Sequence, residues 1–284
     1  MTPFLPGDAG ERIIIGREYD PRPRHVDFHL HDWYEVYFFI RGDMNYLVEK
    51  CVYPMKYGDL VVVNGDEVHM ASFLSDAPYE RIVVHFDPVL VRLFELPGVS
   101  LLGCFTGRAK GEGNKLALDA AETAEVYERL TRMEREGNDG TPVAALMKAV
   151  HLVSLLVFLN AVFDHRGAAP AQSTLPEILT PVLDYIDANL EGELTLEALS
   201  NVFFIDKYYL CRLFKKSIGS TLHQYVIFKR ISEAKRLLSA GMSVTDASMK
   251  CGFTNYNNFL KRFKQTTGVS PGKFRGRVEN RDAF

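Results

Sequence analysis

The pentapeptides LEALS at residues 196–200 and VTDAS at residues 244–248 begin two copies of one pattern in the C-terminal region. In each copy a polar residue, Asp206 or Asn255, is followed by a basic and aromatic run, LCRLFK at 210–215 and FLKRFK at 259–264. The offset between the copies is 48 residues before the turn and 49 after it. Each copy predicts a short helix, a turn and a second helix, which is the arrangement of a helix-turn-helix.

Capping residues and apolar spacing define these helices further. Thr195 and Ser243 are expected to cap the first helix of each unit, and Asp206 and Asn255 the second. The second helices have apolar residues at helical spacing that should face inward: Leu210, Phe214, Ile218, Phe259 and Phe263. The opposite face of each second helix is then available to a partner.

Charge is distributed unevenly along the chain. Residues 205–277 contain fifteen Lys and Arg and three acidic residues, whereas the whole chain has a net charge of -3. A basic region in an otherwise acidic protein indicates a polyanionic partner, because phosphate neutralisation supplies most of the sequence-independent affinity for nucleic acid. The alternative, a solvated amphipathic bundle, is rarely so one-signed.

The second copy and the segment before it resemble the signature of the AraC/XylS family of transcription regulators. The matching residues are Lys229, Arg230, Ala234, Leu237, Leu238, Val244 to Ser248, Gly252, Phe253, Phe259, Lys261, Phe263, Lys264, Gly268, Ser270, Pro271, Phe274 and Arg275. The resemblance implies seven helices, with two recognition helices joined by a long linker helix and placed in successive major grooves about 34 Å apart. Two positions depart from the family pattern, since Lys261 stands where Arg is usual and Asp206 where Ser is usual.

The same resemblance assigns roles in DNA binding. Base-edge contacts fall on Tyr208, Cys211, Arg212, Tyr256, Asn257, Leu260 and Lys261. Arg212 or Lys261 could pair with a guanine edge and Asn257 with an adenine. Phosphate contacts, which set register without reading sequence, fall on Lys215, Arg230, Lys264 and Arg275. For Tyr256 and Leu260 the alternative is ordinary helix packing.

Length and composition indicate a protein of two domains without disulfides. The chain has 284 residues, 47% of them hydrophobic and 24% charged. Its four cysteines lie far apart, so a reducing compartment is favoured over a disulfide framework or a zinc finger. Residues 1–10 lack the pattern of a signal peptide, and the apolar stretch 149–163 is interrupted and shorter than a spanning helix of about 20 residues. The expected location is the cytoplasm.

Residues 12–86 have the pattern of a small β-barrel or sandwich, with short β-branched and aromatic runs between turn residues. The expected strands are Ile13 to Ile15, Glu35 to Ile40, Met44 to Val48, Leu60 to Val63 and Arg81 to Phe86. The phrase HLHDWYE at 29–35, followed by Gly42, resembles the first cupin motif. Gly58 to Leu60 and His69 resemble the second, although Asn64 and Asp66 replace the usual Pro and Gly. The region is similar to the cupin-like sensor domain that precedes the DNA-binding module in many AraC-type regulators.

This sensor region is expected to contain the effector pocket. Residues two apart on an extended strand share a face, which directs inward His29, His31, Trp33, Glu35 and Tyr37, with His69 on a neighbouring strand. Two interpretations remain open. His29, His31, Glu35 and His69 could hold a divalent metal such as Zn, Ni, Mn or Fe, or the same groups could be hydrogen-bonded polar residues of an organic-ligand pocket. His85 is a weaker candidate, expected to be a satisfied strand histidine.

Two helices are expected in the middle of the chain, at residues 116–136 and 143–163, the second starting with Thr141 as cap and Pro142 in its first turn. The second is apolar on more than one face, and the family resemblance favours a homodimer contact there over internal packing. Residues 106–114 are interpreted as a connection, not as a phosphate-binding loop. Residues 1–24 are interpreted as an arm that either folds over ligand or is disordered.

These features predict an α+β protein with an N-terminal cupin-like β-barrel plus helices and a C-terminal all-α double helix-turn-helix. The expected boundaries are residues 1–110 for the sensor with its arm, 111–170 for the helical dimerisation segment and linker, and 171–284 for the DNA-binding domain. The predicted function is a ligand-responsive transcription regulator, not an enzyme. It would activate genes for a sugar or similar metabolite as a homodimer, with RNA polymerase as a further partner. The alternative is a metal-dependent cupin enzyme with an accessory DNA-binding tail.

Overall fold

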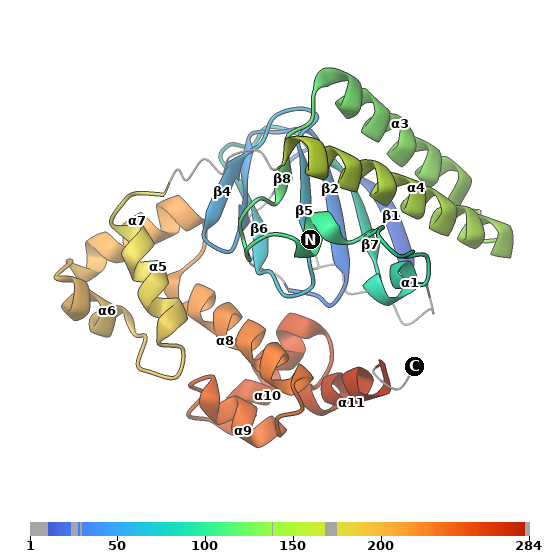
Figure 1. The fold of residues 1–284 in the computed structure, drawn as a ribbon. Helices are drawn as coiled ribbons and strands as arrows, with labels where there is room; N and C mark the ends of the chain where they lie inside the picture. Colours follow the sequence, from blue (N-terminus) through green and yellow to red (C-terminus); the bar gives the residue numbers. More distant parts are fainter. Residues whose placement is uncertain (1–10, 24–27, 29, 138, 168–174, 282–284) are drawn as a thin grey trace.

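Alternating side chains in the N-terminal strands build two antiparallel sheets. The computed structural model describes residues 11–23, 28, 30–137, 139–167 and 175–281 (Figure 1). A five-stranded sheet has the order β1-β7-β2-β5-β8, from β1 (Ile13–Asp20), β2 (Tyr34–Arg41), β5 (Leu60–Val63), β7 (Tyr79–Phe86) and β8 (Lys115–Leu116). A three-stranded sheet has the order β4-β3-β6, from β3 (Met44–Val48), β4 (Cys51–Pro54) and β6 (His69–Phe73).

The two sheets face each other and share a core. Tyr37 and Phe39 of β2 lie in the buried cluster between the sheets, together with Tyr46 of β3. Val36 and Phe38, which alternate with them, lie in the cluster on the other side of the five-stranded sheet. The expected β-rich sensor region is confirmed. Among the described residues, however, its ladders form two separate sheets and do not close into the expected barrel.

Each expected strand is present, and β1, β2 and β7 differ from expectation at their ends; β7 begins at Tyr79 and not at Arg81. β1 continues to Asp20 and pairs with β7 along its whole length, with Ile13 and Ile15 buried. Part of the segment interpreted as an arm is therefore an edge strand, while residues 1–10 lie outside the described residues. β2 begins at Tyr34, so His31 precedes the strand and does not lie on it.

Helices cover the outer face of the five-stranded sheet (Figure 1). They are α1 (Pro88–Arg92), α2 (Gly103–Thr106), α3 (Ala120–Gly137) and α4 (Pro142–Arg166). The predicted start of α4 is confirmed, because the Thr141 side chain accepts a hydrogen bond from the Ala144 amide and Pro142 occupies the first turn. Before α3, residues 106–114 form a connection that Glu67 anchors, since its carboxylate accepts hydrogen bonds of 2.6 and 2.7 Å from Arg108.

Helix α4 extends beyond the predicted range 143–163 by one residue at its start and by three at its end. With 25 residues it is long and apolar enough to cross a membrane by length and composition alone. One face packs on the sheet, where Leu152, Leu155, Leu156 and Leu159 are buried. This packing is that of a helix that covers a core, while Val143, Leu146, Val150 and Val157 of α4 are exposed.

The C-terminal part has the seven helices that the resemblance implied, counted over the described residues. They are α5 (Leu179–Ala188), α6 (Leu196–Phe203), α7 (Lys207–Ile218), α8 (Leu222–Ser239), α9 (Val244–Lys250), α10 (Tyr256–Thr267) and α11 (Pro271–Arg281). All four predicted caps are confirmed, because the side chains of Thr195, Asp206, Ser243 and Asn255 each accept a main-chain hydrogen bond. Helices α6 and α7 form the first helix-turn-helix, α9 and α10 the second, and α8 connects them.

The outer face of the three-stranded sheet packs against the C-terminal helices. Leu47, Val52 and Met70 of this sheet belong to the same buried cluster as Tyr225 of α8. At the end of α7, Gly219 has a φ of +84°, and a Cβ atom there would lie 2.8 Å from the Ser72 hydroxyl of β6. The molecule thus has four layers in succession: helices α3 and α4, the five-stranded sheet, the three-stranded sheet, and α8 with its neighbours.

Candidate DNA interface and effector site

The two second helices of the helix-turn-helix units present polar faces to solvent. Helix α7 buries Leu210, Phe214 and Ile218, and α10 buries Phe259 and Phe263, as their spacing predicted. Six of the seven residues predicted to contact bases are exposed on the opposite faces: Tyr208, Cys211, Arg212, Tyr256, Asn257 and Lys261. The exception is Leu260, which is half-buried and packs against the C-terminal core.

The residues predicted to contact phosphate divide into two groups. Lys215 and Lys264 are exposed in the last turns of α7 and α10, where a cation also complements the helix dipole. Arg275 is half-buried on α11. Arg230 is half-buried on α8 and donates hydrogen bonds to the carbonyl oxygens of Leu190 and Gly192, at 3.1 and 2.7 Å. In this arrangement Arg230 ties α8 to the loop between α5 and α6.

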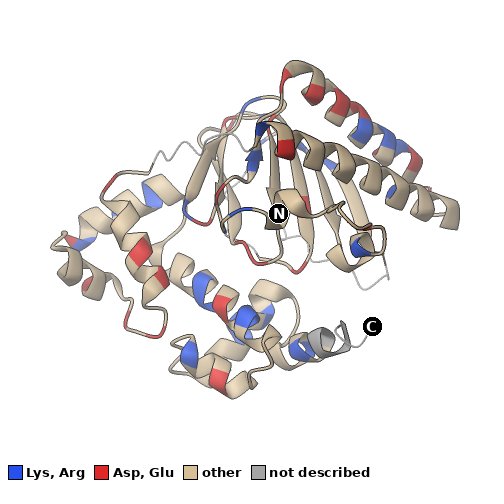
Figure 2. Ribbon diagram, in the orientation of Figure 1, with Lys and Arg blue, Asp and Glu red and all other residues tan. Residues whose placement is uncertain are grey.

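Basic residues are also found where α8 meets the sensor. Helix α8 carries Lys and Arg with one acidic residue, Glu233, among them, in contrast to the mostly uncharged α4 (Figure 2). Lys235 of α8 is 2% exposed, and its ammonium group contacts Asp32 Oδ1 at 2.8 Å and the Gly65 carbonyl oxygen at 2.7 Å. Lys229 of α8 pairs with Glu49 of the sensor and, at 3.0 Å, with Asp187 of α5. Neither lysine belongs to the exposed reader faces.

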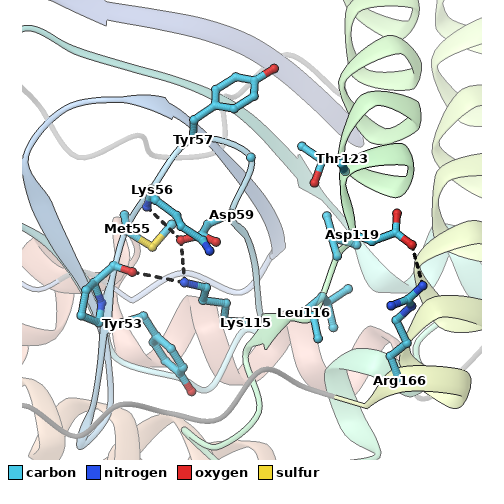
Figure 3. A pocket seen from close by; sticks show the side chains of 15 residues that line it. Tyr53, Met55, Lys56, Tyr57, Asp59, Lys115, Leu116, Asp119, Thr123 and Arg166 are labelled. Carbon is cyan, nitrogen blue, oxygen red and sulfur yellow. Dashed lines mark hydrogen bonds and ion pairs between the residues drawn. The ribbon is translucent and has the colours of Figure 1, made fainter.

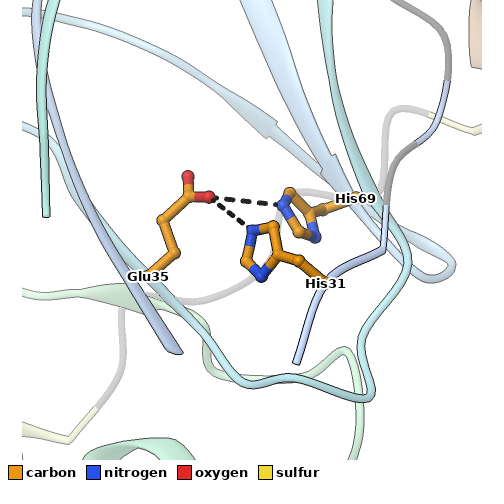
Figure 4. A group of neighbouring side chains, drawn as sticks. All are labelled: His31, Glu35 and His69. Atoms are coloured by element: carbon orange, nitrogen blue, oxygen red, sulfur yellow. Dashed lines mark hydrogen bonds and ion pairs between the residues drawn. The ribbon is translucent and has the colours of Figure 1, made fainter. Parts of the chain in front are cut away.

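A cluster of four side chains lies between the two sheets at one end of the sandwich, and Figure 4 shows three of its members. Its centre is Glu35 Oε2, and the Nε2 atoms of three histidines surround it: His31 at 3.1 Å, His85 at 3.0 Å and His69 at 3.4 Å. All four side chains are at most 6% exposed. We call these residues, His31, Glu35, His69 and His85, the carboxylate-imidazole cluster.

Each member of the cluster is positioned by a different element. Glu35 lies on β2, and the β2–β7 register places His85 directly opposite it. His69 begins β6 in the other sheet, so the cluster bridges the two sheets. His31 precedes β2, and its Nδ1 atom lies 2.8 Å from the carbonyl oxygen of Trp33.

Polar aromatic residues continue from this cluster into the core between the sheets. The Tyr46 hydroxyl donates a hydrogen bond of 2.8 Å to Glu35 Oε1. Tyr37, predicted to line the pocket, is fully buried, and its hydroxyl is 2.6 Å from that of Tyr79. Trp33, also predicted to line it, is buried.

Electrostatics favour an ionised carboxylate among these rings. Burial lowers the pKa of His31 to about 4, although its hydrogen bond to Glu35 acts in the opposite direction. Burial alone would raise the pKa of Glu35. The charge of His85 and hydrogen bonds from the three imidazoles outweigh burial and hold this pKa well below its ordinary value.

The structure brings together most, but not all, of the predicted pocket residues. His31, Glu35 and His69 meet as expected, whereas His29 lies outside the described residues. His85 was interpreted as a satisfied strand histidine and is in fact a full member of the cluster. The signal for it was available in principle, because antiparallel pairing of the strand at 35–40 with the strand at 81–86 brings residues 35 and 85 opposite each other. The register itself could not be read from one sequence.

Away from this cluster, a cavity of about 810 Å³ opens between the β4–β5 loop, the start of α3 and the end of α4 (Figure 3). Its volume is within the range of small-molecule sites. Four of the charged side chains that line it form two ion pairs, Lys115 with Asp59 at 2.5 Å and Arg166 with Asp119 at 2.5 Å. The carboxylate-imidazole cluster is the better candidate, because its polar atoms converge on one point.

Comparison with family models identifies both parts of the chain. A model described as an AraC-like ligand binding domain matches residues 13–106, and a model described as a helix-turn-helix domain matches residues 199–277. This chain belongs to the AraC/XylS family. The regulator therefore combines a ligand-binding domain with a DNA-binding domain and is a ligand-responsive transcription regulator.

Relatives of the regulator cover most of its length. The HTH-type transcriptional activator RhaR of Escherichia coli (strain K12) is 23% identical over 249 residues, which are 87% of this chain and 86% of RhaR. Among solved structures, ToxT from Vibrio cholerae O395 is 13% identical with a TM-score of 0.38, and the match covers 94% of this chain and 98% of that one. The C-terminal domain of AraT, a response regulator from Geobacillus stearothermophilus, is 25% identical with a TM-score of 0.36 and covers 37% and 88%.

Proposed function

We propose that the regulator senses a small effector at the carboxylate-imidazole cluster and transmits its presence to the linker helix α8. The observation that carries this proposal is the position of Phe28 and of His31 and Asp32. Phe28 packs on Tyr225 of α8, with ring centroids 5.5 Å apart. Three residues later, His31 contacts Glu35 in the cluster. One short segment thus contacts both the candidate effector site and the helix between the two DNA readers.

The route from the cluster to α8 passes through Lys235. The acceptors of its ammonium group are Asp32, the carbonyl oxygen of Gly65 and, at 3.4 Å, the carbonyl oxygen of His31. An effector that displaces the His31 ring also moves the main chain at residues 31–32. Breaking a buried ion pair costs about 3–5 kcal/mol, so even a partial change at Lys235 is large enough to shift a two-state equilibrium.

The consequence for DNA binding follows from the place of α8 in the fold. Helix α8 fixes the positions of α7 and α10 relative to each other, and the sensor holds α8 through Lys229 and Lys235. Release of this contact changes the population in which both readers fit successive major grooves. The effector then controls DNA affinity without touching DNA.

Substitution of Asp32 tests this route. In the full-length chain, Asp32→Asn is expected to increase amide exchange along α8 and to change affinity for the operator DNA by at least about tenfold, a coupling of about 1.4 kcal/mol. Asp43→Asn is the matched control, since Asp43 is exposed in the β2–β3 turn on the same domain. Equal exchange and equal DNA affinity in wild type and Asp32→Asn would refute the route through Lys235.

We further propose that α4 forms a homodimer contact. Val143, Leu146, Val150 and Val157 are 51–68% exposed, and their spacing places them along one face of α4. This stripe is on the side away from the sheet, so a second copy can pack on it without disturbing the sensor core. Exposed apolar stripes of this kind are typical of interaction surfaces.

RhaR is a transcriptional activator, so we propose that this regulator also activates transcription, in the cytoplasm, and contacts RNA polymerase. The effector class proposed from the sequence is a sugar or a similar metabolite. A metal-dependent enzyme with a DNA-binding tail stays the alternative prediction, and turnover of a substrate by metal-loaded protein would support it.

A further inference from the structure

We infer that the carboxylate-imidazole cluster is a binding site for one divalent first-row transition-metal ion, with His85 as a ligand from β7. This inference rests on the proposed function only for its regulatory consequence, namely that the ion acts at the effector site. The binding site itself follows from the tautomers of the histidines, the spacing of the donor atoms and the chemistry of the set.

Main-chain contacts determine which nitrogen of two rings faces the centre. His31 Nδ1 lies 2.8 Å from the Trp33 carbonyl oxygen, and His69 Nδ1 lies 2.9 Å from the Glu67 carbonyl oxygen. A carbonyl oxygen can only accept, so each Nδ1 carries the proton. In a neutral ring Nε2 then presents a lone pair, and in both residues this atom points at Glu35 Oε2, which also presents lone pairs.

A hydrogen bond from such an Nε2 atom to Glu35 Oε2 requires a doubly protonated ring, whereas a metal ion can be held by the lone pairs of both atoms. Either the rings accept further protons or a metal ion is shared by the nitrogens and the carboxylate. A histidine that donates Nδ1–H to a main-chain carbonyl and directs Nε2 inward has the usual arrangement of a metal ligand. Tyr46, which donates to the other oxygen of Glu35, would orient that carboxylate as a supporting hydrogen bond.

Donor spacing fits a first-row ion. Ligand atoms about 2.1 Å from a metal are about 3.0 Å apart at a 90° angle and about 3.4 Å apart at a tetrahedral angle. The three Nε2 atoms lie 3.0–3.4 Å from Glu35 Oε2. The ligand atoms of His31, Glu35 and His69 all lie within 4.8 Å of one another. Small side-chain adjustments therefore suffice to enclose an ion.

The donor types select the class of ion. Three imidazole nitrogens and one carboxylate oxygen suit Zn²⁺, Fe²⁺, Co²⁺ or Ni²⁺, whereas Mg²⁺ and Ca²⁺ require oxygen ligands. Burial adds to this, because a carboxylate that is 1% exposed is costly without a nearby positive charge. An ion at this site would join β2, β6 and β7 and would fix His31 next to the Asp32 contact with Lys235.

Metal titration of tag-free, full-length protein tests the inference. After chelator treatment and dialysis, the protein is titrated with Zn²⁺ and with Co²⁺, and bound metal is measured by mass spectrometry and by the visible absorption of Co²⁺. We expect one ion per chain. His85→Gln should weaken binding by at least about 100-fold, since changes to groups that only support a ligand already cost about 10–100-fold. His151→Gln is the matched control, because His151 is a half-buried histidine paired with Glu136 outside the cluster.

The outcomes separate the inference from the proposed function. Absence of stoichiometric metal from wild type, or unchanged affinity in His85→Gln, overturns the inference. If His85→Gln does not fold, the nearly isosteric Glu35→Gln must abolish the Co²⁺ absorption for the inference to stand. Operator affinity is measured separately with and without Zn²⁺. If metal binds but does not change operator affinity, only the regulatory role of the ion is refuted. If the protein binds no metal but organic ligands change its operator affinity, the inference fails and the proposed function is supported.

Discussion

At the scale of single residues, some basic side chains of the C-terminal region are exposed on the reader helices and others make contacts within the protein. Their charge alone does not distinguish the two groups. Arg212 and Lys261 are exposed on reader helices, whereas Arg230 and Lys235 are bound to carbonyl oxygens and a carboxylate inside the protein. The sequence correctly placed the first pair on polar helix faces. It could not place the second pair, because their partners, such as Asp32, are far away in the chain.

Arg212 and Lys215 on α7 should have separable effects on DNA binding. Arg212→Ala is expected to cost about 1–3 kcal/mol at one base-pair position and to relax specificity there, since an Arg–guanine contact reads a base edge. Lys215→Ala should weaken all sequences nearly equally. Selection from randomised operators, with affinities measured for the best and single-mismatch sites, distinguishes them. A uniform loss in Arg212→Ala would assign that residue to phosphate instead.

Glu49 should make the contact between sensor and α8 dependent on pH. Burial alone would raise the pKa of Glu49, but Lys229 and Lys110 outweigh burial and hold it below 4.5. At a pH between the lowered pKa and 4.5, Glu49 is therefore ionised in the folded protein, whereas it is mostly protonated in the unfolded chain. The stabilisation is fully present above pH 4.5 and is lost as pH falls through the lowered value. Urea unfolding of wild type and Glu49→Gln from about pH 7 to about pH 3 should show a steeper decline in wild type, and parallel curves would contradict this.

At the scale of elements, sequence periodicity was a good guide to helices and a partial guide to sheets. The caps and apolar spacing of α6, α7, α9 and α10 depend on residues close in sequence, so they could be read directly. The pairing of β2 with both β5 and β7 joins residues far apart in the chain, and no local pattern specifies it. For the same reason His31, Glu35 and His69 were found through a motif, while His85 required the register.

A single charge substitution tests the exposed apolar stripe of α4 as a dimer contact. Leu146→Glu places a charge at a position that is 63% exposed, so monomer stability should change by no more than about 0.5 kcal/mol. If α4 pairs with α4 of a second copy, the two introduced charges lie within a buried interface and the dimer dissociates. Sedimentation velocity at several protein concentrations measures this. Leu93→Glu, at an apolar position 74% exposed beyond α1, should leave association unchanged.

At the scale of the whole molecule, the sensor and the readers share α8, and this determines which charges reach DNA. Contacts through His31 and Asp32 connect the carboxylate-imidazole cluster, which is the proposed effector site, with Lys235 of the linker helix. Lys229 and Lys235 neutralise carboxylates of the protein itself, so the basic character of residues 205–277 overstates the charge available to phosphate. The contact between the sensor and α8 is thus maintained by two lysines that a count of charges along the sequence would assign to DNA binding.

Salt dependence of DNA binding separates these two groups of lysines in the full-length protein. Each phosphate contact contributes about 0.9 to the slope of log affinity against log salt concentration. Lys264→Met should reduce the magnitude of the slope by about 1, because Lys264 is exposed on α10. Lys235→Met should leave the slope unchanged and alter instead the dependence of affinity on effector or metal, because its ammonium group is bound to Asp32 and Gly65 of the sensor. Affinities measured between about 50 and 300 mM salt give both slopes. Equal reductions in the two variants would mean that Lys235 leaves the sensor and contacts phosphate when DNA binds, and that the sensor must release α8 before both readers engage.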